Sequence, residues 1–231
     1  MYNALGFPLQ VDLPIRIDQL LAGGAIPVQW VQEHLHPGTA VPWYGTLVSA
    51  VYCTHFLVTP MLAIVLWLRH RDRFLVWINM VVVLAVAGLV TYVVLPTAPP
   101  WLASSAGDLG GPPVGRYTSE GFDVIGLKMV GAAVGLGQHL VNPVAAMPSL
   151  HLAFATLAVG FLWRAVRPSR RALLLLYPLA MGFALVYGGE HYLTDELAGA
   201  LYAVVVLLLF RCPLGRAWRR PDAQVNAGRN G

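Results

Sequence analysis

The feature that most constrains this chain is a series of apolar segments, each close to the length needed to cross a bilayer. A transmembrane helix needs roughly 20 predominantly apolar residues. Five segments satisfy this, at roughly residues 41–68, 74–95, 144–163, 172–189 and 192–210. The sequence therefore predicts an all-α fold, a polytopic transmembrane helical bundle with five to six spans.

Composition agrees with this expectation. Charged residues make up only 11% of the chain and hydrophobic residues 57%, whereas a soluble domain carries about 25% charged residues. The net charge of +4 does not indicate nucleic-acid binding, because the basic residues form short clusters between apolar segments. We expect no nucleic-acid partner.

The basic clusters predict the orientation of the bundle. All but three of the 15 lysine and arginine residues fall in the stretches 69–73, 164–171 and 211–229. Five alternating helices place all three stretches on one side, which the positive-inside rule makes cytoplasmic. The exceptions, Arg16, Arg116 and Lys128, are then outside with the amino terminus. We expect an integral protein of a bacterial plasma membrane.

The chain divides into three regions on this basis. Residues 1–40 mix apolar and polar positions and suit an interfacial segment. Residues 41–212 form the membrane domain, including a long outer loop at 96–143, and residues 213–231 form a polar cytoplasmic tail that we expect to be disordered. Residues 121–140 are moderately apolar, but a span there would reverse every later loop, so we expect an interfacial or re-entrant piece.

Three polar motifs converge on the outer side in this topology. They are Pro96–Trp101 after the second span, Pro148–His151 at the third, and His191–Asp195 at the fifth. Ionisable groups at membrane depth are costly and usually functional. Because the topology rests on the arginines alone, the convergence of the histidines is an independent indication of a shared site.

The motif Pro148–His151 suits the start of a helix. With Pro148 in the first helical position, Ser149 and His151 fall in the first turn, whose free N–H groups attract anions. Ser149 is therefore a candidate phosphate-binding residue. The alternative is that Ser149 only caps the helix and His151 packs internally.

His191 and Asp195 are spaced to meet on one helix face. Residues four apart on a helix lie roughly 5–6 Å apart at Cβ. The carboxylate can then hold one imidazole nitrogen, fix the tautomer and leave the other nitrogen as a nucleophile. The alternative is an interfacial histidine followed by an aspartate that favours a helix N-terminus.

Two histidines so placed can transfer a phosphoryl group. One imidazole attacks phosphorus and the other protonates the departing oxygen. Water as the acceptor makes the protein a phosphatase, and an alcohol makes it a phosphotransferase. The residues do not decide between them.

Pro148-Ser149-x-His151 followed by His191-x-x-x-Asp195 resembles the type 2 phosphatidic acid phosphatase superfamily, over roughly residues 90–205. The segments 145–151 and 96–101, with His191, Tyr192, Asp195 and Gly199, look closest to bacterial relatives of inositol phosphorylceramide synthase. The resemblance implies His191 as a nucleophile that becomes phosphorylated, Asp195 as its orienting partner, His151 as the acid and Ser149 as a phosphate ligand. It implies no metal or other cofactor, and it leaves the acceptor open between water and an alcohol such as inositol.

The chain departs from that family in its basic residues. The family has a Lys, six residues and then Arg-Pro, and an Arg six positions before its nucleophile, where this chain has Leu185. Arg116 and Lys128 are our candidates for balancing the phosphate charge. Trp101, Tyr187 and Glu190 are candidates for the substrate pocket.

Two other functions remain open. His151, His191 and Asp195 are also a legitimate catalytic zinc set, which would make the protein a metal-dependent intramembrane hydrolase. A transporter or binding protein that grips anionic lipid at a helix end is the other. The lipid itself could be a phosphatidate, a polyprenyl diphosphate or an inositol-linked lipid.

Overall fold

A computed structural model of the chain describes residues 6–36, 38, 40–140 and 142–213, with His139 and Leu140 described in backbone only. These residues are predominantly helical and contain no strand, only isolated bridges that join Thr97 to Gln10 and to Ala145. The all-α prediction is confirmed. The predicted disordered tail, residues 213–231, lies outside the described residues except for its first position.

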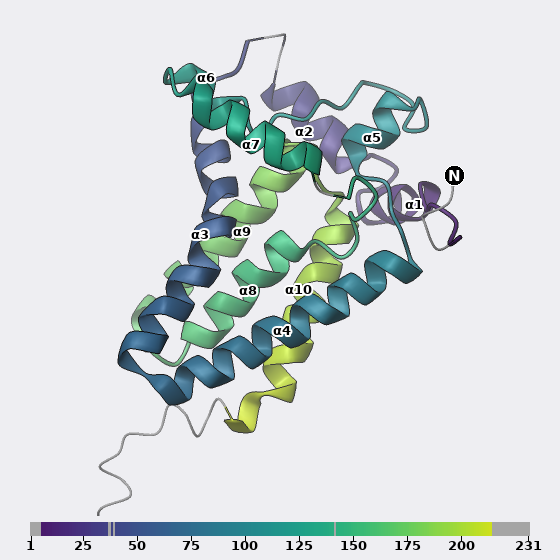
Figure 1. The fold of residues 1–231 in the computed structure, drawn as a ribbon. Coiled ribbons are helices and arrows are strands. Elements are labelled where there is room, and N and C mark those ends of the chain that lie inside the picture. The colour runs from purple at the N-terminus through teal and green to yellow at the C-terminus, as the bar shows by residue number, and fades with distance from the viewer. Residues whose placement is uncertain (1–5, 37, 39, 141, 214–231) are drawn as a thin grey trace, which may run out of the picture.

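Five helices form the bundle: α3 (Gly45–Arg69), α4 (Arg71–Val94), α8 (Leu150–Leu162), α9 (Arg171–Tyr187) and α10 (Leu193–Leu209). The α3–α4 turn, the α8–α9 connection and the end of α10 lie together at the lower end in Figure 1. That connection includes the short 3-10 helix η1 (Pro168–Arg170). The arginine-rich connections of the described chain therefore share one end of the bundle.

Within the described part of the chain, three stretches are long and apolar enough to cross a membrane: α3, α4 and residues 168–187, which join η1 to α9. Their surfaces carry many exposed large apolar side chains, such as Leu68, Leu89 and Leu179. Lipid, rather than water, suits such a surface. The remaining bundle helices are shorter, with 13 residues in α8 and 17 in α10. Helix length thus supports membrane association but does not establish five or six spans.

The core of the bundle lies where α4, α8 and α10 meet. Trp77, Met80 and Leu84 of α4 pack with Leu157 and Phe161 of α8, and all five are fully buried. Such close packing fixes the relative positions of the helices. The upper ends of α8 and α10 are consequently held side by side.

The remaining helices gather at the other end of the bundle, and we call them the helical cap (Figure 1). They are α1 (Asp12–Leu21), α2 (Pro27–Leu35), α5 (Pro100–Ser105), α6 (Gly121–Val124) and α7 (Lys128–Leu140). The break between α6 and α7 means that residues 121–140 do not form one continuous helix. The interfacial position expected for residues 1–40 stays a prediction.

Candidate active site

The three polar motifs are joined by backbone hydrogen bonds below the helical cap. The Ser149 amide donates to the Asp195 carbonyl at 2.9 Å, and the Trp101 amide donates to the Gly189 carbonyl at 3.2 Å. A Cβ atom at Gly199 would collide with the Ser149 carbonyl, so glycine permits this close approach of α8 and α10. The structure therefore brings together segments that the sequence placed at one membrane face.

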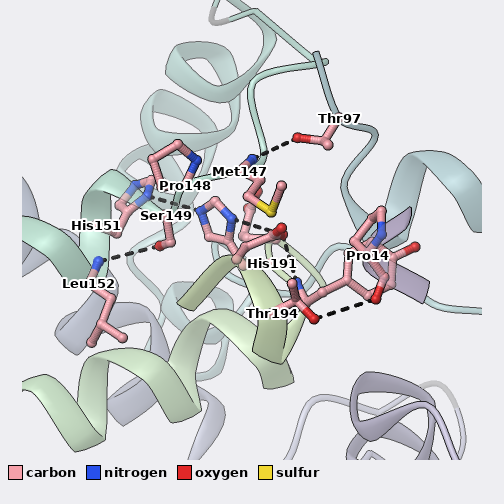
Figure 2. Close-up of polar contacts among 12 residues, drawn as sticks. Pro14, Thr97, Met147, Pro148, Ser149, His151, Leu152, His191 and Thr194 are labelled. Carbon is pink, nitrogen blue, oxygen red and sulfur yellow. Dashed lines mark hydrogen bonds and ion pairs between the residues drawn. The ribbon is translucent and has the colours of Figure 1, made fainter. Parts of the chain in front are cut away.

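The segment before α8 differs from the expected helix. The predicted span begins near residue 144, but α8 begins at Leu150, with Ser149 as its N-cap and Pro148 ahead of the cap. Thr97 holds this segment in a non-helical conformation: its amide donates to Val144, its carbonyl accepts from Ala146, and its hydroxyl accepts from the Met147 amide at 2.8 Å (Figure 2). Pro148 is thus not in the first helical position, although His151 is still in the first turn.

His151 and His191 point toward one another (Figure 2). The distance from His191 Nε2 to His151 Nδ1 is 3.4 Å. On the other side of the His191 ring, Nδ1 lies 3.5 Å from Asp195 Oδ2, and Asp195 is fully buried. This is an ion-pair distance, and the contact lacks the alignment of a full hydrogen bond, since Nδ1 has no hydrogen-bond partner.

The order of these atoms determines which protons and lone pairs the two histidines can present to a substrate. With a proton on Nδ1 facing Asp195, the Nε2 atom of His191 carries a lone pair and faces His151. A proton on His151 Nδ1 then lies between the two rings. The arrangement offers a nucleophilic nitrogen and a proton donor on opposite sides of a single point, as in-line group transfer requires.

The environment of His191 favours its protonated form. Burial alone would lower its pKa, but the contact with Asp195 and the negative charges of Glu196 and Glu190 outweigh it, and the pKa of His191 is raised above 6.5. His191 lies in the connection between α9 and α10. A carboxylate-held imidazole of this kind gains basicity and nucleophilic strength.

A cavity of about 1060 Å³ opens at the histidine pair. His191 and His151 line it together with Arg116, Glu190 and Trp101. The rest of the wall is largely apolar and comes from α3, α4 and α7, including the side chains of Phe56, Leu89, Val93, Met129, Val130 and Val134. One polar end and a long apolar wall suit a molecule with a polar head and a hydrocarbon chain.

Arg116 is engaged by Glu190 in the cavity wall. Its Nε and Nη2 atoms donate to Glu190 Oε1 and Oε2, both at 2.9 Å. The indole of Trp101 lies 4.8 Å from the guanidinium carbon. The sequence-predicted residues Arg116, Glu190 and Trp101 therefore form one cluster next to the histidines.

Three other predicted residues do not line the cavity. Ser149 is fully buried, and its hydroxyl accepts from the Leu152 amide at 3.4 Å as a helix cap. Lys128 is exposed at the start of α7. The hydroxyl of Tyr187 forms a 2.8 Å hydrogen bond with His36 Nδ1, in a separate cluster between α2 and α9.

Asp18 of α1 is a residue that sequence reasoning missed. Its fully buried carboxylate accepts from the Thr194 amide at 2.8 Å, the Thr194 hydroxyl at 2.6 Å and the Leu193 amide at 3.1 Å. These amides belong to the first turn of α10, where backbone N–H groups have no acceptor within the helix. Asp18 thus caps the helix that carries Asp195. The sequence feature that could have identified Asp18 is its spacing, which places it one turn after Pro14 and Ile15 on the buried face of α1.

His55 of α3 is a third histidine at the site. Its ring centroid lies 4.2 Å from that of His151, and its buried Nδ1 has no hydrogen-bond partner among the described residues. Tyr52, one turn earlier, stacks on His151 with a centroid distance of 5.2 Å. These rings fix the orientation of His151 in the cavity wall.

The donor set does not suit a metal ion. Asp195 faces Nδ1 of His191, whereas His151 faces Nε2 on the opposite side of the ring, so the three groups do not converge on one point. Across the described part of the chain, no group of three or more His, Cys, Asp or Glu side chains is arranged to hold a metal. The geometry therefore gives the zinc alternative no support.

Comparison with known proteins identifies one family. A sequence model described as the PAP2 superfamily matches residues 24–209, which include all three polar motifs. No curated protein and no solved structure matches the chain. The matched region begins after α1, so Asp18 lies ahead of it.

Proposed function

Because this chain belongs to the PAP2 superfamily, we propose that it is an integral-membrane enzyme that cleaves or transfers the phosphate ester of a lipid through His191. The family implies a phosphatase-type activity on phosphoric esters, and the long apolar helices indicate a membrane protein. The observation that carries the proposal is the facing pair of imidazoles, 3.4 Å apart and backed by Asp195, at the polar end of an apolar cavity.

The first step follows from the positions of the nitrogens. His191 Nε2 attacks phosphorus and forms a P–N bond, while the P–O bond to the lipid alcohol breaks. The proton of His151 Nδ1 passes to the departing oxygen. Because 3.4 Å leaves no room for a phosphoryl group, substrate binding must separate the two rings.

The second step regenerates the enzyme. An acceptor hydroxyl attacks phosphorus, gives its proton to His151 and displaces His191. Asp195 stabilises the positive charge on the phosphorylated imidazole throughout. The motifs that look closest to relatives of inositol phosphorylceramide synthase support an alcohol, such as inositol, as the acceptor, and water would make the same site a phosphatase.

We place the site at the extracytoplasmic face of a bacterial plasma membrane. The arginine-rich ends of α3, α4, α8 and α9 lie away from the helical cap. The positive-inside rule assigns such an end to the cytoplasm. In this proposal α8 and α10 complete a set of five spans, with local thinning or tilt of neighbouring lipid accommodating their shorter length.

The test is substitution of the proposed nucleophile in purified protein. We expect His191→Ala to lower turnover of lipid phosphate esters by about 10³-fold or more. His34→Ala is the matched control, because His34 is exposed on α2, where its ring contacts Trp30, and it does not line the cavity. Full turnover by the His191 variant would contradict the proposal.

Two further readouts separate the other functions. Quenching during turnover with denaturant at alkaline pH, where a P–N bond survives, and intact-mass measurement should detect a phosphoryl adduct that is absent in His191→Ala. Activity should persist after chelation, whereas a metal-dependent hydrolase would lose it. A lipid transporter would turn over no phosphate ester at all.

A further inference from the structure

The Arg116–Glu190 pair is the most fully bonded ionic contact of the cavity. The guanidinium and carboxylate meet through two parallel hydrogen bonds of 2.9 Å. Glu190 Oε1 also accepts from the Thr118 hydroxyl at 2.6 Å and from Gln138 Nε2 at 2.9 Å. The side chain of Glu190 is only 8% exposed. A carboxylate with four donors is held in place.

This pair cancels the main positive charge of the cavity. Among the described side chains that line it, Arg116 is the sole lysine or arginine. Glu190 neutralises that charge, and Lys128 lies outside the lining. The other nearby ionisable groups, Asp18, Asp195 and Glu196, are carboxyl groups. They add no positive charge, so only histidine protonation can balance a bound phosphate.

A site with this balance should discriminate between phosphate esters by charge. A phosphomonoester carries about −1.5 to −2 at pH 7, whereas a phosphodiester carries a single negative charge. In a desolvated cavity each uncompensated charge is costly, and like charges in contact are disfavoured. The dianion would meet Glu190, with no free lysine or arginine in the described lining to offset its second charge.

We infer that Glu190 is a specificity-determining residue, which masks Arg116 and makes the site select lipid phosphodiesters over lipid phosphomonoesters. This inference rests on the proposed function of the same site. In the reaction, His191 Nε2 bonds to the phosphorus of the diester, and the P–O bond to the diacylglycerol breaks. His151 protonates that oxygen, and the other esterified alcohol stays on phosphorus when the acceptor attacks and displaces His191.

A matched pair of lipids tests the selectivity. Dioleoyl phosphatidate and dioleoyl phosphatidylmethanol share both acyl chains and differ by one methyl ester and its charge. Cleavage at the glycerol side releases the same diacylglycerol from either one, and mass spectrometry can measure it. For the wild-type full chain in detergent micelles we expect kcat/KM to be at least about tenfold higher for phosphatidylmethanol.

Glu190→Gln should reverse this preference. The amide keeps the shape of the side chain but releases the Arg116 charge into the cavity. We expect the ratio of kcat/KM for phosphatidylmethanol to that for phosphatidate to fall by about tenfold or more. The double variant Arg116→Gln/Glu190→Gln removes both charges and should keep the wild-type preference. Glu120→Gln, at a half-buried glutamate outside the cavity lining, should also keep it.

The outcomes separate the two proposals. Preference of the wild type for phosphatidate, or an unchanged ratio in folded Glu190→Gln, overturns the selectivity and leaves the phosphoryl-transfer function standing. Absence of turnover with both lipids overturns the function and the selectivity with it. The wild-type ratio needs no substitution, so a Glu190→Gln variant that fails to fold does not remove the test.

Discussion

Two regions of this protein bury carboxyl groups in opposite ways. Where the helical cap meets the bundle, Asp18 and Glu190 are buried with three and four hydrogen-bond donors respectively. At the contact of α8 and α10, Asp195 Oδ1 and both carboxyl oxygens of Glu196 are buried without any hydrogen bond in the described structure. Buried polar groups are normally paired, so the second region is the exception.

The difference indicates where the fold is stabilised and where chemistry takes place. A saturated carboxylate resists movement, which suits an anchor such as Asp18. An unsaturated group next to His191 is costly in the resting state but can respond when charge develops on the imidazole. We therefore expect loss of Asp18 to change stability and substitutions in the second region to change turnover.

Asp195→Asn should have the largest effect of these substitutions, and we expect that effect on activity rather than on stability. The amide cannot balance a positive imidazole, and it can hold His191 in the wrong tautomer, so we expect kcat/KM to fall by about 10²–10⁴-fold. Stability should change by less than about 1 kcal/mol, because Asp195 Oδ1 has no hydrogen bond to lose and the oxygen of asparagine can replace Oδ2 as the acceptor of the Tyr192 amide. Both are measured on purified protein, by lipid turnover and by denaturant titration.

The pH profile of the same variant gives an independent readout. His191 must be unprotonated at Nε2 to attack, so activity is lost as pH falls through its pKa. Asp195 helps to raise that pKa above 6.5, and the acidic limb of kcat/KM should move to lower pH in Asp195→Asn. An unchanged limb together with a large loss of stability would make Asp195 a structural residue like Asp18.

Asp18→Ala should have the next largest effect, this time on stability. Removing the carboxylate leaves the Leu193 and Thr194 amides without their buried acceptor, at a cost of about 2–4 kcal/mol. Asp12→Ala is the matched control on the same helix, since its side chain is 79% exposed and lies 3.9 Å from Arg16. Denaturant titration of both variants measures the difference. Equal stability would mean that α1 does not hold α10.

Ser149→Ala should have a smaller effect. It tests whether Ser149 stabilises the fold or takes part in turnover. As an N-cap that accepts from Leu152, its hydroxyl should contribute about 1 kcal/mol to stability and little to turnover. Ser105→Ala removes an exposed hydroxyl from α5 and serves as the control. A loss of kcat/KM of about tenfold or more, with stability unchanged, would instead support the phosphate-binding role expected from the sequence.

Hydropathy and charge predicted the helices well because both are local properties. The predicted segments at 41–68 and 74–95 correspond to α3 and α4, and those at 172–189 and 192–210 correspond to α9 and α10. The start of α8 was misplaced by about six residues. Its cause is the set of bonds from Thr97, some 50 positions away, which no local pattern reveals.

The site shows the same division between local and distant contacts. His191 and Asp195 are only four residues apart, so their spacing predicted the contact, although His191 precedes α10 and does not lie on one helix face with Asp195. Asp18 lies 176 positions from Thr194, and Gln138 lies 52 positions from Glu190. These partners depend on how the helical cap folds over the bundle. Sequence reasoning therefore identified groups that lie close together in the sequence or at one membrane face. It missed the groups that tertiary packing brings to the site.

Lys128→Ala should have the smallest effect, although the sequence singled this residue out with Arg116. Lys128 is exposed at the start of α7 and does not line the cavity. We expect kcat/KM for lipid phosphate esters to stay within about twofold of wild type at moderate salt. If the ammonium attracts anionic lipid to the cap, a loss should emerge at low ionic strength and vanish as salt screens it. A large loss that salt does not alter would place Lys128 at the phosphate and contradict the charge balance assigned to the cavity.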